Sequence, residues 1–280
     1  SRFFCKDFKD SFITLMLPML LKSFSRLFPA LINRKKNAGT NKMLEEKRDK
    51  LNLKEFVASK EKVFEGKKYL YVPKPGSDSI IISMSTHNYG ERYYCLRSLL
   101  ELCPCSLLFL KDPNNTYYLD KDGGKTNSRL LKTILKNYSP SKVTFFGSSM
   151  SGYAALRNSI LFNCNAIVCN PQICYREAYQ SAWGELRETL IRANYNNQFQ
   201  DIPELFKNKK SDSLWCICHG DSPMDQLNVL QLKMMKDEES RVLYFHYPDL
   251  NHGFYFGNLL SVIDLHFLLI QLREIKLVRI

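Results

Sequence analysis

Short apolar runs alternate with longer amphipathic segments from about residue 67 to the C-terminus. Runs of this length suit buried strands, and the segments between them repeat apolar residues at helical spacing. Such alternation is typical of a largely parallel sheet with helices on both faces. We predict strands at 68–73, 79–85, 106–110, 142–147, 165–169, 213–218 and 241–246, and helices at 90–102, 126–138, 150–162, 174–195, 226–237 and 256–274.

The first 66 residues follow another pattern. Phe4, Phe8 and Phe12 recur four apart with charged residues between them, as in an amphipathic helix. Proline and charged residues interrupt the apolar stretch 11–33, so it lacks the run of about 18 residues that a spanning helix needs. The small-residue cleavage site of a secretory signal is also absent. Residues 34–66 are dense in Lys, Glu, Asn and Arg, which predicts a solvated helical linker.

We therefore expect a basic helical extension over 1–66 and an α/β domain over 67–280. Two roles for residues 1–33 stay open: contact with a membrane or a partner, or docking on the α/β domain. The chain has 40 Lys and Arg residues against 28 Asp and Glu, a formal charge of +12. This excess would attract polyanions, phosphorylated cofactors or anionic lipid, and a basic surface that only keeps the protein dissolved is the alternative.

Nine cysteines occur at irregular spacing, which indicates free thiols in a reducing compartment, and we expect the cytoplasm. The pairs Cys103/Cys105 and Cys216/Cys218 are each separated by one residue, whereas structural zinc sites space their ligands by about two to four. We therefore predict no metal site. Cys216 and Cys218 fall on one face of a strand, where cysteine packs as a small apolar residue.

An apolar strand runs through a small-residue turn into a helix at 143–155, Val-Thr-Phe-Phe-Gly-Ser-Ser-Met-Ser-Gly-Tyr-Ala-Ala. This is the context of a nucleophile elbow, in which the residues two before and two after the serine must be small. Centring on Ser149 places Gly147 and Ser151 there, whereas centring on Ser148 or Ser151 would place bulky side chains there. We predict Ser149 as the nucleophile; an ordinary strand–helix turn is the alternative.

An oxyanion hole would need two N–H donors near this serine. The backbone N–H of Met150, at the start of the helix, is the expected first donor. The second should come from the loop after the strand at 79–85, around Ser85, Thr86 and His87.

The base and its acid should follow the serine in the chain order Ser, Asp or Glu, His. His252 lies between the last predicted strand and the final helix, where the base belongs, and the other four histidines precede the serine or fall in or next to predicted strands and helices. The loop after the strand at 213–218 offers Asp221 and Asp225 as the acid. We favour Asp225, which stands at the turn into the next helix, although either aspartate could instead cap that helix.

These motifs resemble those of the α/β-hydrolase-type O-acetyltransferases of bacterial capsule synthesis, from about Lys68 to the C-terminus. The matching segments are Gly147-Ser148-Ser149, Asn170-Pro171-Gln172, Gln198-Phe199-Gln200-Asp201-Ile202 and the loops of Asp225 and His252. The resemblance implies an α/β-hydrolase-like fold in which Ser149 takes an acetyl group from acetyl-CoA and passes it to a sugar hydroxyl, with His252 as base. It also implies that His87, Asn170 and Gln172 contact substrate; an ordinary turn after a strand explains the last two as well.

The expected function is therefore metal-free O-acetylation of a capsular or other cell-surface polysaccharide. The expected partner is a polyanionic polysaccharide or oligosaccharide acceptor, with residues 1–33 as the contact to a membrane or a capsule-synthesis complex and with no nucleic acid. Aromatic residues in 175–195, among them Trp183, occupy the place where α/β hydrolases insert lids and could stack on sugar rings, unless this segment is a core helix. A carbohydrate esterase or deacetylase with the same triad, and a non-catalytic binding protein of this fold, are the alternatives.

Overall fold

The computed structural model describes residues 52–209, 211–235, 241–248, 251–253 and 259–277. By its internal contacts the chain forms two units, Ser1–Asn52 and Leu53–Ile280, and every helix and strand described below belongs to the second. Within the described residues, no helix is both long and apolar enough to cross a bilayer. The predictions for residues 1–33 and for most of the linker lie outside the described residues.

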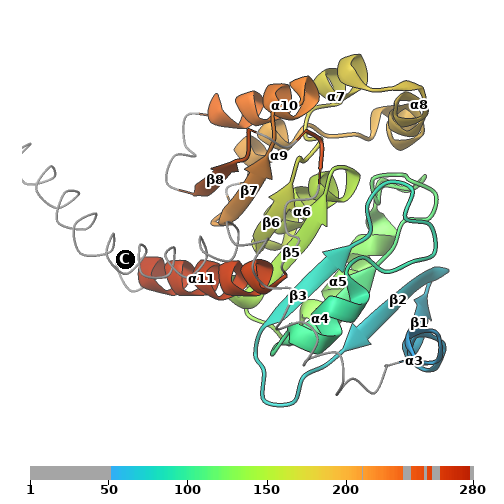
Figure 1. The fold of residues 1–280 in the computed structure, drawn as a ribbon, viewed down its shortest axis with the longest axis vertical. Helices are drawn as coiled ribbons and strands as arrows, with labels where there is room; N and C mark the ends of the chain where they lie inside the picture. The colour runs from blue at the N-terminus through green and yellow to red at the C-terminus, as the bar shows by residue number, and fades with distance from the viewer. Residues whose placement is uncertain (1–51, 210, 236–240, 249–250, 254–258, 278–280) are drawn as a thin grey trace, which may run out of the picture. The chain divides into compact units, whose positions relative to one another are not determined.

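A sheet of eight strands forms the centre of the second unit, with β1 and β8 at its two edges (Figure 1). The strands are β1 (Glu61–Phe64), β2 (Lys67–Val72), β3 (Ile80–Met84), β4 (Ser106–Leu110), β5 (Val143–Ser148), β6 (Asn165–Cys169), β7 (Trp215–His219) and β8 (Val242–His246). Their order is β1-β2-β4-β3-β5-β6-β7-β8. From β4 to β8 all neighbours are parallel, and β1 and β2 add an antiparallel edge. This confirms the predicted, mostly parallel sheet.

Helices cover both faces of the sheet (Figure 1). The α-helices of the described residues are α3 (Leu53–Lys60), α4 (Leu96–Leu102), α5 (Lys125–Leu135), α6 (Met150–Phe162), α7 (Tyr175–Ser181), α8 (Gly184–Ala193), α9 (Ile202–Lys209), α10 (Pro223–Lys233) and α11 (Leu260–Leu277). Buried side chains of α5 to α10 belong to the core on one face, and those of α4 and α11 to the core on the other.

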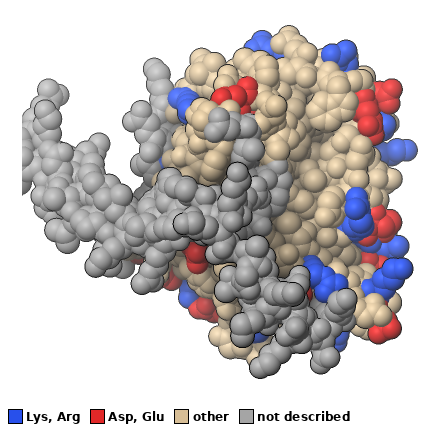
Figure 2. Space-filling view, viewed as in Figure 1, with Lys and Arg blue, Asp and Glu red and all other residues tan. Residues whose placement is uncertain are grey.

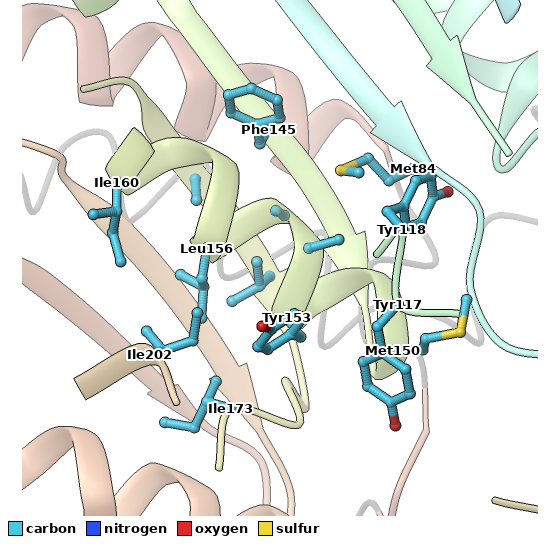
Figure 3. Close-up of a cluster of buried hydrophobic side chains, with 14 of the residues drawn as sticks. Met84, Tyr117, Tyr118, Phe145, Met150, Tyr153, Leu156, Ile160, Ile173 and Ile202 are labelled. Carbon is cyan, nitrogen blue, oxygen red and sulfur yellow. The ribbon is translucent and has the colours of Figure 1, made fainter. Parts of the chain in front are cut away.

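The central strands are buried on both sides, which explains why they appear in the sequence as continuous apolar runs. In β3, Ile80 and Ile82 belong to the core that includes α5 and α6, whereas Ile81 belongs to the core that includes α4 and α11. Figure 3 shows part of the first core, to which α6 contributes Tyr153 and Leu156. The burial of these side chains therefore holds α6, the helix that follows the predicted elbow, in place.

All seven predicted strands are present close to their predicted bounds. The sheet also contains β1, which lies in the segment predicted as a linker, so the sheet begins before residue 67. Its middle residues, Lys62 and Val63, are exposed, and so the strand has almost no apolar pattern to reveal it. Short, charged edge strands of this kind protect a sheet from pairing with other chains.

Two predicted helices differ from the structure. The helix predicted at 174–195 is divided into α7 and α8, because Ala182 and Trp183 are extended, with ψ of 140° and 166°. The helix predicted from residue 90 begins only at Leu96, because Gly90 and Cys95 adopt positive φ angles of 59° and 56°. The first change creates a bend that exposes Trp183, and the second lengthens the loop after β3.

The eight cysteines within the described residues are all free thiols. Cys216 and Cys218 on β7 are completely buried in the core beneath α4 and α11, together with Cys169 of β6. Their packing role was predicted from their spacing and is confirmed.

Candidate active site

Ser149 lies at the sharp turn between β5 and α6. Its φ of 53° and ψ of −117° form a backbone conformation that residues other than glycine rarely adopt. The backbone N–H of Ser149 donates to the carbonyl of Cys169 on β6 at 2.8 Å, and this hydrogen bond holds the turn. Its side chain is mostly buried, with 8% of the residue exposed. The strand, the strained serine and the helix together form the geometry of a nucleophile elbow.

The small residues around Ser149 are required by close backbone contact. A Cβ atom added to Gly147 would overlap the backbone carbonyl of Ser151, and one added to Gly152 would lie 3.0 Å from Pro171. Ser151 itself fits because its hydroxyl bonds to the N–H and carbonyl of Ser148, at 2.9 and 3.0 Å. Serine at this position therefore adds two hydrogen bonds inside the elbow.

The structure brings Ser149, His252 and Asp225 into one chain of hydrogen bonds. Nε2 of His252 lies 2.9 Å from Oγ of Ser149, and Nδ1 of His252 lies 2.6 Å from Oδ1 of Asp225. Asp225 is 1% exposed, in the first turn of α10, where Ser222 caps the helix by accepting from the Asp225 N–H at 3.2 Å. This geometry suits a serine nucleophile, a base and an acid that orients the base.

Asp221, the alternative acid, pairs with a different histidine. Its Oδ1 lies 2.6 Å from Nε2 of His246 on β8 and 2.9 Å from Nε2 of Gln226. The hydrogen bond from His246 holds the pKa of Asp221 below its usual value. His246 stacks on His219 with ring centroids 4.8 Å apart. Asp221 therefore belongs to a separate polar cluster and is not bonded to His252.

Two backbone N–H groups, one at the elbow and one on the loop that contacts it, are candidate oxyanion donors. Met150 is the first residue of α6, and its N–H has no acceptor among the described residues. The hydroxyl of Thr86 donates to the carbonyl of Ser148 at 2.7 Å, which places the loop after β3 against the elbow. The N–H of Thr86 is likewise without an acceptor in the described part of the chain. One donor at the start of a helix and one on this loop is the arrangement expected of an oxyanion hole, and that role stays a prediction.

Ser85 does not have a free donor, contrary to its predicted place in the oxyanion hole. Its N–H donates to the carbonyl of Leu110 on β4 at 3.0 Å, which continues the hydrogen bonds of the sheet. Its hydroxyl donates to the carbonyl of Arg92 at 2.8 Å. Both groups are thus used in holding the loop, and the backbone N–H groups of Thr86 and His87 remain as the candidate donors from this segment.

Gln172 is completely buried, so it does not line a substrate pocket as predicted. Its Oε1 accepts the hydroxyl hydrogen of Tyr117, and its Nε2 lies 3.7 Å from Sδ of Met224. The backbone N–H of Gln172 donates to the carbonyl of Ser149 at 3.4 Å. The side chain is thus bonded within the core, and the backbone of Gln172 contacts the elbow.

Asn170 is also buried, and both ends of its amide are occupied. Nδ2 donates to the carbonyl of Gly253 at 2.8 Å, and Oδ1 accepts from the N–H of Gly220 at 3.1 Å. The residue adopts a φ of 44°, which asparagine tolerates better than most residues. Asn170 therefore joins the loop of His252 to the loop after β7, and its burial does not support the substrate contact that was predicted.

His87 joins the loop after β3 to helix α8. Its Nε2 lies 3.1 Å from the hydroxyl of Thr189, and its ring meets the edge of Trp183 at a centroid distance of 6.3 Å. Burial lowers the pKa of His87, and Arg192 adds to this effect while Glu185 opposes it. Thr189 carried no signal in the sequence, because a single threonine within a helix has many structural roles. Contact between His87 and substrate stays a prediction.

Nowhere in the described part of the chain do three His, Cys, Asp or Glu side chains gather as metal ligands. The remaining histidines lie where the sequence placed them: His246 in β8, His219 at the end of β7 and His266 within α11.

The sheet order, the strained serine turn and the chain order Ser149, Asp225, His252 define an α/β-hydrolase-type fold. No protein-family model matches the chain, and no curated protein sequence matches it. Among solved structures, the capsule O-acetyltransferase of Neisseria meningitidis serogroup A is similar, with a TM-score of 0.55 at 19% identity over 75% of this chain and 93% of that one. The sequence-based resemblance to capsule O-acetyltransferases is thereby confirmed at the level of fold.

Two further structures extend this comparison. A mutant of the meningococcal enzyme in complex with CoA has a TM-score of 0.52 at 16% identity, over 74% of this chain and 92% of that one. Acetyl xylan esterase 1 of Thermoanaerobacterium sp. has a TM-score of 0.52 at 13% identity, over 72% of this chain and 80% of the esterase. One fold thus carries both a transferase and an esterase.

Proposed function

We propose that this protein is a serine acyltransferase that moves an acetyl group from acetyl-CoA to a hydroxyl of a bacterial surface polysaccharide. The observation that carries the proposal is the hydrogen-bond chain from Asp225 through His252 to Ser149 at a strained elbow. The similar meningococcal structure with CoA supports the donor, and its description as a capsule O-acetyltransferase supports the acceptor class.

In the first half-reaction, Oγ of Ser149 attacks the thioester carbonyl while Nε2 of His252 takes the hydroxyl proton. Asp225 keeps the other ring nitrogen protonated and stabilises the imidazolium. The N–H groups of Met150 and Thr86 stabilise the oxyanion of the tetrahedral intermediate. The C–S bond then breaks, His252 returns the proton to the leaving thiolate, and free CoA leaves acetyl-Ser149.

In the second half-reaction, a sugar hydroxyl attacks the carbonyl of acetyl-Ser149 while His252 takes its proton. The same two N–H groups stabilise the second oxyanion. The ester bond to Ser149 breaks, His252 protonates the serine oxygen, and the acetylated sugar leaves. Arg192, exposed on α8 and bonded to Thr189 at 3.0 Å, provides a positive charge near the site for an anionic acceptor or a CoA phosphate.

An esterase is the second candidate, because water can replace the sugar hydroxyl with the same residues, and the similarity to acetyl xylan esterase supports it. The two reactions differ in how well the site excludes water and orients the second hydroxyl.

The test combines labelling with turnover. A fluorophosphonate should label the wild-type protein and Ser148→Ala but not Ser149→Ala, because only Ser149 is bonded to His252. Absence of labelling in the wild type would instead favour a non-catalytic binding protein. Release of CoA thiol from acetyl-CoA should then increase on addition of de-O-acetylated capsular oligosaccharides, and mass spectrometry should detect the acetylated sugar. Acceptor-independent hydrolysis of simple esters alone would assign the protein as an esterase.

A further inference from the structure

Trp183 lies at the bend between α7 and α8, and 50% of the residue is exposed. Its indole ring meets the ring of His252 edge-on at a centroid distance of 6.5 Å, and the ring of His87 at 6.3 Å. Nε2 of His252 is in turn 2.9 Å from Oγ of Ser149. A large aromatic surface is therefore open to solvent beside His252, the residue bonded to Ser149.

The backbone segment that carries this ring is held in place by hydrogen bonds. The N–H of Arg187 donates to the carbonyl of Trp183 at 2.9 Å, which anchors the backbone at the start of α8. The same helix is tied to the loop after β3 by the His87–Thr189 hydrogen bond at 3.1 Å and by Asn88, which donates to Glu185 at 2.7 Å. A ring that is already held in place loses little conformational freedom when a ligand covers it.

An ordered tryptophan exposed beside a reactive serine indicates a flat ligand with an apolar face. A sugar ring offers such a face through its C–H groups. The pantetheine arm that carries the thioester is a narrow, flexible chain, and the adenine lies at the far end of CoA from the thioester. The flat group nearest the reacting atoms is therefore the acceptor sugar and not the donor.

We infer that Trp183 is the platform on which the acceptor sugar stacks while its hydroxyl meets acetyl-Ser149. This inference rests on the proposed function and assigns its acceptor subsite to the bend between α7 and α8. Tyr195 provides a matched control, because it is also 50% exposed and has no ring contact with either histidine in the described structure.

Kinetics provide the first test. Trp183→Ala should raise the KM for de-O-acetylated capsular oligosaccharide by about tenfold or more, while the KM for acetyl-CoA stays within about twofold of wild type. Trp183→Phe should restore most of the acceptor affinity because it keeps an aromatic face. Tyr195→Ala should behave as wild type. An equal rise in both KM values, or an acceptor KM unchanged in Trp183→Ala, would overturn the inference.

Fluorescence tests the same subsite without turnover. The chain has two tryptophans, and the other, Trp215, is 1% exposed, so acrylamide quenching reports mainly on Trp183. In Ser149→Ala, the capsular oligosaccharides should protect the fluorescence from acrylamide. Protection without acetyl transfer by the wild type would support the subsite and refute the proposed reaction. Acetyl transfer without protection would refute the subsite and leave the proposed function in place.

Discussion

Asp221 and Asp225 lie on the same short segment, and each is bonded to a different histidine. The reason is local. Ser222 caps α10 and Pro223 occupies its first turn, so Asp225 falls inside the helix and faces His252, whereas Asp221 precedes the helix and faces His246. One helix cap thus decides which carboxylate orients the proposed base.

Asp225→Asn should therefore reduce kcat by about 10⁴-fold, because the amide can no longer hold the required tautomer of His252 or stabilise its charge. Asp221→Asn should stay within about threefold of wild type, since it weakens only exposed contacts with His246 and Gln226, neither of which is bonded to His252. Hydrolysis of p-nitrophenyl acetate and acetyl transfer both measure the effect, with circular dichroism as the check on folding. A comparable loss in both variants would contradict the assignment of Asp225.

At this scale the sequence selected Ser149 by the size of its neighbours and His252 by chain order, and the structure places the two side chains within hydrogen-bond distance. It did not predict that the N–H of Ser85 is used in the sheet, or that Gln172 points into the core. Both facts depend on the register of a strand and on how deeply a side chain is buried. Neither can be read from the residues that follow a strand in the sequence.

β5, the turn and α6 form a single structural unit, the elbow, because they approach one another so closely. Gly147 is the point of closest contact, since any side chain there meets the backbone of Ser151. Gly184, at the start of α8, has no atom within 4 Å of the position that a Cβ would occupy. We therefore expect alanine to be tolerated at Gly184 and to disrupt the structure at Gly147.

Gly147→Ala should lower the free energy of unfolding by about 2–3 kcal/mol and reduce fluorophosphonate labelling, because the strand and helix must separate to admit the methyl group. Gly184→Ala should change the free energy of unfolding by less than about 1 kcal/mol, and we expect the change to be stabilising. Urea denaturation followed by circular dichroism measures both. If Gly147→Ala unfolds at the same urea concentration as wild type, the close contact in the elbow is not required.

The elements that were predicted correctly are those whose burial leaves a pattern. Both faces of β3 and β5 are covered, so their sequences are apolar throughout. Edge strand β1 has exposed middle residues, and α9 is a short helix that was not predicted. The bend at Trp183 depends on a change of backbone angle just before Gly184, which the helical spacing of 174–195 concealed.

The positive charge of the whole molecule is unevenly distributed. Residues 1–51 contain 12 Lys and Arg against 5 Asp and Glu, and the remaining residues contain 28 against 23, so +7 of the formal +12 falls in the first segment. On the described part of the face in Figure 2, basic and acidic side chains are interspersed. Attraction of a polyanionic acceptor through net charge therefore depends more on residues 1–51 than on residues 52–280. This attraction stays a prediction.

His266 makes the stability of the molecule depend on pH. It is buried in α11 with Nδ1 2.7 Å from the hydroxyl of Thr144, and burial lowers its pKa to about 4. An unfolded chain takes up this proton near the usual histidine pKa of about 6.5. Between these values the unfolded state binds more protons, so the contribution of His266 is complete above about pH 6.5 and is lost as the pH falls towards 4.

The free energy of unfolding of the wild type should therefore fall by about 3 kcal/mol more than that of His266→Gln between pH 6.5 and 4. Urea denaturation at several pH values measures the difference. Leu269→Ala, in the same helix, is the control, because it should lower stability by a similar amount at every pH. Parallel curves for the wild type and His266→Gln would show that the buried ring does not govern this pH dependence.

The two hydrogen bonds of Asn170 bear on the order in which the candidate site assembles. Its amide holds the carbonyl of Gly253, next to His252, and the N–H of Gly220, on the segment that leads to Asp225. In chain order the ribosome delivers Ser149 first, then Asp225 and then His252. A nascent chain thus holds Ser149 without the imidazole of His252 until the loop of His252 has been made and has reached Asn170, so the hydrogen-bond chain of the candidate site is the last part of that site to form.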